Sequence, residues 1–233
     1  MMRRILLVTL ALTTALATAC SAEDKPADTS SLPDGAGLLK DASAATANIK
    51  SAHFTLTVNG KVPDLPVKKA EGDLTREGGE AGAAKGTVSM ELLGDLFEGE
   101  FVLVNDSLYI KGPTGGWQKL PAAMVRNLYD PAAILDPDRG IAKVLSSVRD
   151  PKTEGTEDID GVSTYRVTGS VTKDVVADLV PGVDTDVDIT FWLRQDGKHL
   201  PVKASVKMQL EGAPTVDVTL TDIDKQVSIT APQ

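Results

Sequence analysis

The chain has 233 residues, a length that suits one large domain better than two small ones. Its net charge of −9 argues against binding to nucleic acid and against docking on anionic lipid headgroups, because both need basic surfaces. Aromatic residues make up only 4% of the chain, which also disfavours a binding surface built on stacked aromatic side chains.

The amino-terminal segment has the layout of a bacterial secretory signal. Arg3 and Arg4 precede an apolar run over residues 5–17 that holds no charge and ends in small residues. This run is too short for a bilayer-spanning helix, which needs about 20 residues. We therefore predict a signal peptide over residues 1–19. Its removal leaves 22 basic and 33 acidic residues, a net charge of about −11.

Cys20 is the single cysteine and follows Ala17-Thr18-Ala19 directly. Plain secretion after a cut at this small-x-small pattern is one interpretation, and an incidental cysteine in an uncleaved segment is another. A cysteine at this position also fits the bacterial lipobox, although the usual lipobox has Leu in place of Ala17. We predict that Cys20 is lipidated, since two or three acyl chains on one residue anchor a protein stably to the outer face of a membrane.

A short tether and one folded domain follow the cysteine. Residues 20–32 are polar and predict a flexible tether, and residues 33–233 form the domain. Residues 34–50 predict a first helix. From residue 53 the period changes to two, which predicts a half-buried antiparallel strand. The apolar residues at helical spacing are Leu38, Leu39, Ala42, Ala45 and Ile49, and those of the strand are Phe54, Leu56 and Val58.

Further strands are predicted on both sides of a helical insertion. The first group covers about 71–76, 86–93, 99–105 and 107–111, with a tight turn at Asp106. Between 120 and 150 the pattern is helical in pieces, with helix starts at Pro121 and Pro131 and a cap at Asp138. The second group covers 164–171, 186–194, 202–210, 216–221 and 225–230, and a short helix lies near 174–180.

The order of elements is helix, strands, helices, strands, and each strand is apolar on one face only. This order describes an α+β domain in which a single curved antiparallel sheet of about nine strands, a half-barrel, is covered by helices. A sheet of that size twists and curls, and it can leave an apolar hollow under its helical layer. Periodicity alone does not reveal whether a hollow is present.

No constellation of catalytic or metal-binding residues is readable in the sequence. His53 and His199 are the two histidines, and neither has a partner at the spacing of a zinc site. The acidic runs at 184–188 and 154–160 lack the order of a calcium loop, and alternation places Asp186 and Asp188 on a solvated face. We predict that the protein is not an enzyme and binds no metal and no cofactor.

Several short segments, in order along the chain, resemble one lipoprotein family. They are LPD at 32–34, KSAH at 50–53 leading into LTVNGK at 56–61, GDLT at 72–75, YDP at 129–131 and PD at 137–138. Behind a lipobox, these segments resemble the mycobacterial LppX/LprA/LprF/LprG lipoproteins, and the LprG-like members in particular. The resemblance runs from the tether to the last strands.

The resemblance implies a half-barrel that encloses acyl chains between its sheet and helices, akin to the carriers that move lipoproteins to an outer membrane. It implies transport of triacylated glycolipids, such as phosphatidylinositol mannosides and lipoarabinomannan, and of triacylglycerol, together with a major-facilitator export pump. It also implies recognition of the acylated protein by Toll-like receptor 2. Two other hypotheses stay open: a structural or adhesive surface lipoprotein with a filled core, and a chaperone for other lipoproteins.

The predicted lipid-binding residues come from the resemblance and from strand parity. The resemblance places Val88 on a pocket-lining strand, and parity adds residues of the same strand and of its neighbour. The helical insertion supplies the others, although each of these residues suits an ordinary core as well as a pocket. The predicted set is Val88, Met90, Leu92, Phe54, Leu56, Val58, Leu128, Ile134, Leu135, Val144, Leu145 and Val148.

Overall fold

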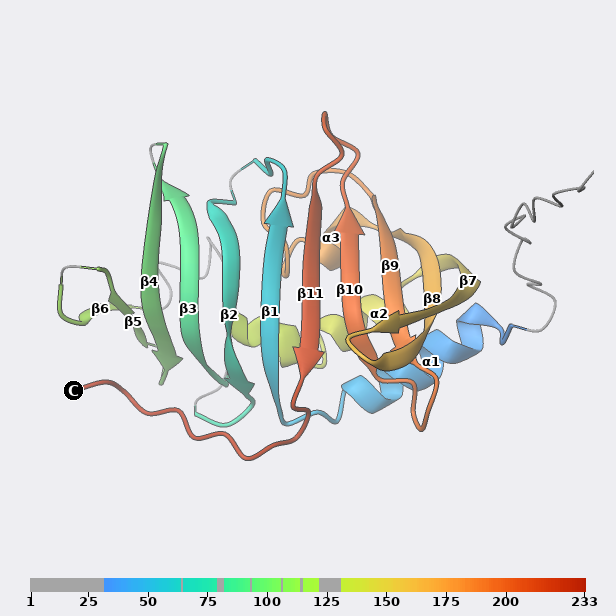
Figure 1. The fold of residues 1–233 in the computed structure, drawn as a ribbon, viewed down its shortest axis with the longest axis horizontal. Helices are drawn as coiled ribbons and strands as arrows, with labels where there is room; N and C mark the ends of the chain where they lie inside the picture. Colours follow the sequence, from blue (N-terminus) through green and yellow to red (C-terminus); the bar gives the residue numbers. More distant parts are fainter. Residues whose placement is uncertain are drawn as a thin grey trace, which may run out of the picture.

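A single antiparallel sheet dominates the computed structural model, which describes residues 32–63, 65–78, 82–92, 94–105, 107–113, 115–121 and 131–233. Within these residues the sheet has eleven strands in the order β6-β5-β4-β3-β2-β1-β11-β10-β9-β8-β7 (Figure 1). The bounds of the first group are β1 Ser51–Asn59, β2 Val67–Thr75, β3 Ala83–Leu92, β4 Asp95–Val104, β5 Ser107–Lys111 and β6 Gln118–Pro121. Those of the second are β7 Arg149–Ile159, β8 Val162–Val171, β9 Val187–Arg194, β10 Pro201–Lys207 and β11 Thr215–Thr221.

Two meanders of consecutive hairpins make up this sheet. The first runs outward from β1 to β6, and the second runs back from β7 to β11. They join where β11 pairs with β1, which places Leu56 opposite Val218 and Phe54 opposite Leu220. The predicted α+β class with one antiparallel sheet is therefore confirmed, with eleven strands in place of about nine.

The helical elements lie on one side of the sheet (Figure 1). Helix α1 spans Gly35–Thr46, and its first turn is capped by Asp34, whose Oδ2 accepts a hydrogen bond of 2.8 Å from the Gly37 amide. The insertion between the meanders holds a 3-10 helix, η3, over Pro131–Leu135 and α2 over Ile141–Ser146. Helix α3, over Lys173–Val176, lies between β8 and β9. The buried core fills the space between this layer and the apolar face of the sheet.

Some sequence-based predictions were wrong. Residues 118–121 form β6, where a helix was expected to begin at Pro121. The rest of that expected helix lies outside the described residues, and so does Asp106, where a tight turn was predicted. Strand β7 occupies 149–159, where the sequence indicated only the end of a helical segment and an acidic surface cluster. β7 is an edge strand exposed along most of its length, so its sequence shows no alternation of apolar residues.

The carboxyl-terminal segment after β11 does not form the predicted strand over 225–230. It runs as extended chain along the lower edge of the view in Figure 1 and is held at its start, where Asp224 Oδ1 accepts from the Lys50 amide at 2.7 Å. Further along, Ile229 packs against Ala83, Val102 and Val104 on the face opposite the helices. The alternating apolar residues of 225–230 therefore reflect an apolar contact on one side of a segment that does not form a strand.

Two glycines allow the close approach of β2 and β3. Gly72 and Gly86 are register partners, and they lie between Phe54 of β1 and Phe101 of β4 in one row across the apolar face. A Cβ atom on Gly86 would overlap the carbonyl oxygen of Glu71, and one on Gly72 would overlap that of Lys85. The aromatic side chains on either side of this pair are both buried.

Gly86→Ala is expected to lower the free energy of unfolding by at least about 2 kcal/mol, because its methyl group overlaps backbone that cannot turn away. Urea denaturation of residues 21–233 measures this change. Gly155→Ala in β7 is the matched control, since a Cβ there meets no atom within 4 Å. Equal unfolding midpoints for the two variants would contradict the proposed close approach.

Candidate functional site

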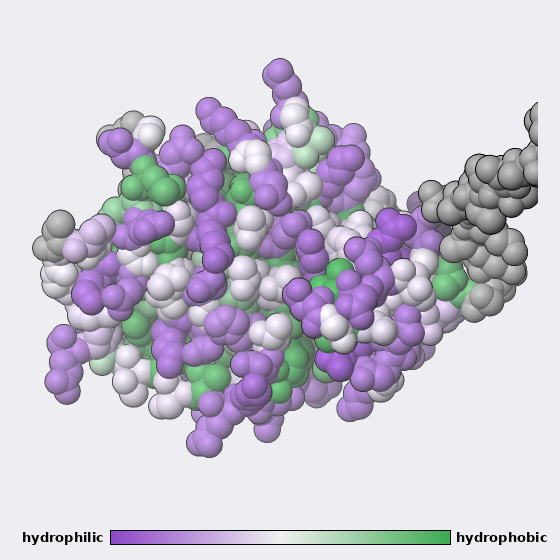
Figure 2. Space-filling view, in the orientation of Figure 1, coloured by the Kyte–Doolittle hydropathy of each residue, from purple (hydrophilic) through white to green (hydrophobic). Residues whose placement is uncertain are grey.

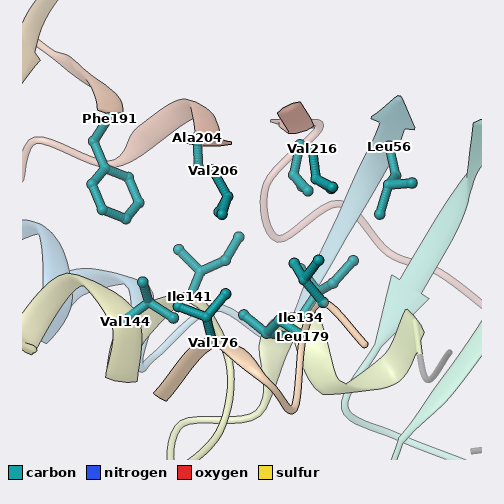
Figure 3. Close-up of a pocket in the computed structure, with 12 residues that line it drawn as sticks. Leu56, Ile134, Ile141, Val144, Val176, Leu179, Phe191, Ala204, Val206 and Val216 are labelled. Atoms are coloured by element: carbon teal, nitrogen blue, oxygen red, sulfur yellow. The ribbon is translucent and has the colours of Figure 1, made fainter. Parts of the chain in front are cut away.

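An apolar cavity of about 40 Å³ lies between the sheet and the helical layer. Figure 3 shows its walls, with side chains of the sheet pointing down toward side chains of the helical segments. The sheet contributes Leu56, Phe191, Ala204, Val206, Val216 and Val218, and the helical side contributes Ile134, Ile141, Val144, Val176, Leu179 and Val180. None of these twelve side chains carries a polar atom, so the cavity offers only dispersion contacts and exclusion of water.

The sheet wall follows directly from strand alternation. In β9 the buried residues are Val187, Ile189, Phe191 and Leu193, and the residues between them face the other side. The β1–β11 and β9–β10 pairings then bring Leu56, Val218, Ala204 and Phe191 into one row. One strand of this wall comes from the start of the chain, and three come from its last third.

A rigid turn holds the helical wall together. Asp136 Oδ1 accepts hydrogen bonds from the amides of Asp138 and Arg139, at 2.9 and 3.1 Å, and its Oδ2 accepts 2.9 Å from Arg139 Nε. Gly140 closes the turn, donating its amide to the Asp136 carbonyl oxygen at 2.7 Å. The side chain of Asp138 makes no cap hydrogen bond at the start of α2, so the predicted cap was wrong. The turn between Ile134 and Ile141 is instead stabilised by Asp136.

The pKa of Asp136 reflects two opposing effects. Burial alone would raise it, because it disfavours the charged carboxylate. The hydrogen bonds from the Arg139 side chain and the Asp138 amide, with the charge of Arg139, outweigh burial and lower the pKa below its ordinary value of 3.8. The carboxylate is therefore ionised at neutral pH and stabilises the turn.

The cavity is small for an acyl chain. An engineered apolar cavity that binds benzene has about 150 Å³, and pockets for larger ligands have about 300–1,000 Å³. The cavity in this structure is therefore too small to hold an acyl chain. The helical wall is made of short segments, with five residues in η3, six in α2 and four in α3. The sheet wall belongs to a continuous hydrogen-bonded ladder, so the helical wall has fewer backbone constraints than the sheet wall.

Comparison with known proteins agrees with this architecture. The model of the LppX_LprAFG lipoprotein family matches residues 34–229. This chain belongs to that family.

Individual relatives cover nearly the whole chain. The lipoarabinomannan carrier protein LprG of Mycolicibacterium smegmatis is 37% identical, over 96% of this chain and 93% of its own length. LprG of Mycobacterium tuberculosis H37Rv is 36% identical, over 91% of this chain and 88% of its own length. Among solved structures, LprF from Mycobacterium bovis has a TM-score of 0.76 at 28% identity, covering 86% of this chain and 98% of that one. LppX of M. tuberculosis has a TM-score of 0.64 at 25% identity, covering 85% and 100%.

The residues predicted from the family resemblance fall into four groups in the structure. Leu56, Ile134 and Val144 line the cavity. Phe54, Val58, Leu135 and Leu145 are buried in the surrounding core, and Val88, Met90 and Val148 are half-buried at its edge. The side chain of Leu92 is not described, and Leu128 lies outside the described residues, as does Cys20 with most of the tether.

Strand parity alone did not single out several lining residues. Phe191, Ala204, Val206 and Val216 were predicted to face inward or to lie on strands, but not to form a site. Val176 is the last residue of α3, and Leu179 and Val180 lie in the turn that follows it, before β9. The missing information was that β11 lies beside β1, a pairing between distant parts of the chain.

Neither histidine lies at the cavity. His53 Nδ1 lies 3.0 Å from Asp73 Oδ1 on the polar face of the sheet, and His199 Nδ1 lies 2.8 Å from the Arg194 carbonyl oxygen. Asp186 and Asp188 are exposed, as strand alternation predicted. Among the residues that the structure describes, no three His, Cys, Asp or Glu side chains gather as a metal site, and no helix is long and apolar enough to cross a membrane.

Asp136→Asn is expected to cost about 1–3 kcal/mol of stability at pH 7, because charge-assisted hydrogen bonds are replaced by neutral ones. A lowered folded-state pKa gives stability that is present above the unfolded value of 3.8 and is lost as pH falls through the folded value. Urea unfolding of both proteins between pH 7 and pH 3 should therefore show a difference that shrinks below about pH 4. A difference that is constant with pH would contradict this assignment.

Proposed function

We propose that this protein is a cell-envelope lipid carrier that takes up acyl chains between its sheet and its helical layer. The observation that carries the proposal is the cavity, whose twelve lining side chains are all apolar and face one another across the two layers. Membership in a lipoprotein family supports it, as do relatives named lipoarabinomannan carrier proteins.

The energetics explain why a carrier of this kind is needed. Exposing a 16-carbon chain to water costs on the order of 12 kcal/mol, at about 0.8 kcal/mol for each methylene. Such a chain crosses an aqueous compartment slowly unless an apolar surface covers it. A cavity without polar groups serves this purpose and leaves recognition of the headgroup to residues outside it.

Uptake requires the two walls to separate. Contacts between them at the cavity are apolar and non-directional, so an acyl chain that enters replaces one set of dispersion contacts with another. Helix α2 is also linked to α1 by a hydrogen bond of 2.8 Å from Ser43 Oγ to the Ala142 carbonyl oxygen. We infer that the η3–α2 unit moves as one body because of the Asp136 turn, and that the sheet stays in place.

The cargo and partners follow from the family resemblance. We propose triacylated glycolipids, including phosphatidylinositol mannosides and lipoarabinomannan, and triacylglycerol as cargo, received from a major-facilitator export pump. The half-buried Val88, Met90 and Val148 would extend the site beyond the closed cavity. The lining side chains contain no nucleophile, acid or base, so we expect transport without a chemical step.

The small size of the cavity favours one alternative, a surface lipoprotein with a filled core. About 40 Å³ is what imperfect packing of an ordinary core could leave. The two functions differ in a direct measurement, since only a carrier binds lipid when its walls separate.

Val206→Trp is expected to lower lipid binding about tenfold or more, because overpacking the cavity costs about 1–3 kcal/mol in the bound state. Mass spectrometry of organic extracts from purified residues 21–233 measures the co-purified lipid. Val202→Trp is the matched control, because Val202 lies on the same strand and is also 8% exposed but does not line the cavity.

Two outcomes of this experiment would contradict the carrier. One is a wild-type protein that contains no lipid even after incubation with phosphatidylinositol mannoside, which would favour the filled core. The other is equal lipid content in Val206→Trp and Val202→Trp. Co-purification of acylated protein in place of glycolipid would identify a lipoprotein chaperone.

Cys20→Ala is expected to release the full-length protein from the membrane fraction and leave its lipid binding unchanged, because anchor and cavity are separate parts of the chain. Cell fractionation followed by immunoblotting measures the release, and lipid extraction measures the binding. The acylated wild type, but not this variant, is expected to activate Toll-like receptor 2. Retention of the variant in the membrane fraction would contradict lipidation at Cys20.

A further inference from the structure

A second hollow lies on the face of the sheet opposite the helical layer. It has a volume of about 490 Å³ and crosses strands β2 to β5. That volume falls in the range of about 300–1,000 Å³ found for small-molecule sites. Figure 2 shows this face of the protein, where hydrophilic side chains extend across the strands. We call the hollow the outer groove.

Two rows of polar side chains line the outer groove, and the first row has four members. Glu71, Thr87, Glu100 and Lys111 are successive register partners on β2, β3, β4 and β5. Lys111 Nζ lies 3.0 Å from Glu100 Oε1. The row thus contains one ion pair, one further carboxylate and one hydroxyl group on four adjacent strands.

The second row lies one pleat further along the strands. Lys69, Ser89 and Glu98 are register partners on β2, β3 and β4. Lys69 Nζ lies 2.6 Å from Glu71 Oε2, which links this row to the first. The hydrogen bond and the charge of Lys69 lower the pKa of Glu71, so that carboxylate is ionised at neutral pH. Val88, between the two rows in sequence, packs into the core on the other face.

The groups in the groove suit a neutral ligand with many hydroxyl groups. Each lysine has three N–H donors and each ionised carboxylate accepts several hydrogen bonds, so both ion pairs keep free donors and acceptors side by side. Two neighbouring hydroxyls of a sugar can donate to the carboxylate and accept from the lysine of one pair. An anion would meet three carboxylates, a cation would meet two lysines, and an apolar ligand would remove water from both ion pairs and from the Glu98 carboxylate without replacing the hydrogen bonds.

Two further observations support a sugar ligand. In the described part of the chain, the hydroxyls of Thr87 and Ser89 and the carboxylate of Glu98 have no side-chain partner, so they are available in addition to the ion pairs. The ring of Trp117 lies 5.8 Å from Lys111 Nζ and is half-buried. Trp117 does not line the groove itself, but its contact with Lys111 places an aromatic ring next to one end of the first polar row.

We propose that the outer groove is a binding site for a neutral oligosaccharide. The proposal rests on the proposed function for the choice of sugar, because a carrier of mannose-containing glycolipids would meet their glycan chains. The groove lies over β2 to β5 on one face of the sheet, and the cavity lies against β1 and β9 to β11 on the other, so the glycan contacts and the acyl contacts are made by different side chains.

Titration calorimetry of residues 21–233 with lipid-free arabinomannan tests the proposal, since this probe has no acyl chain for the cavity. The double variant Thr87→Val with Ser89→Ala is expected to weaken binding about tenfold, because two hydrogen-bonding hydroxyls are lost. The matched control is Thr55→Val with Thr219→Val. These two residues are register partners on β1 and β11, on the same face but outside the groove.

A second arm uses intact lipoarabinomannan and the Val206→Trp variant. If the groove binds glycan as such, Val206→Trp leaves the lipid-free titration unchanged. If the glycan binds only when its acyl chains occupy the cavity, binding is seen only with intact lipoarabinomannan. Both the groove variant and Val206→Trp then weaken that binding. The proposal would be overturned if the wild type, the groove variant and its control bound both probes equally well. It would also be overturned if the wild type bound neither probe. Normal lipid content in Val206→Trp would instead overturn the carrier function alone.

Discussion

The pairing of β1 with β11 is the interaction on which the rest of the structure depends. It joins residues near the start of the domain to residues about 160 positions later, and it turns two meanders into one sheet. Closing a loop of that length costs more chain entropy than closing a local hairpin. The apolar row of Leu56, Val218 and Ala204 across the junction, in which Leu56 and Ala204 are buried and Val218 is half-buried, offsets this cost and forms part of the sheet wall of the cavity. Stability and the candidate site therefore use the same contacts.

The two walls of the cavity differ in their mechanical character. Every strand of the sheet wall is hydrogen-bonded to neighbours on both sides, whereas the opposite wall consists of short helical segments ordered by local turns. In the turn between η3 and α2, the carboxylate of Asp136 accepts three hydrogen bonds. A closed cavity of about 40 Å³ between such walls is consistent with a site that opens only when a ligand enters. In the proposed carrier, an acyl chain would need no polar contact there, and chains of different structure would fit equally.

The two faces of the sheet carry different chemistry because side chains alternate along each strand. In β3, Val88 packs toward the core, and Thr87 and Ser89 face the outer groove. On the same outer face, Trp192 donates a hydrogen bond of 2.8 Å from Nε1 to Glu157, and Lys203 lies 4.9 Å from its ring centre. The carboxyl-terminal segment covers a small apolar cluster through Ile229. The proposed cargo, with apolar chains and a polar glycan, would use this division between the faces.

The sequence by itself determined which side chains point inward, because burial on one face imposes a period of two on strands such as 53–59 and 187–194. It also placed helix α1 and the helical insertion, and its lipobox predicted the anchor at Cys20. It did not reveal β7, because this mostly exposed edge strand has no alternating apolar residues, and it suggested a strand at 225–230, where the alternation reflects an apolar contact and not strand pairing. Only the tertiary structure decided that Leu56 meets Val218, that Asp136 orders the helical wall and that a second, polar groove crosses β2 to β5. These features depend on which strands become neighbours, and local periodicity does not contain that information.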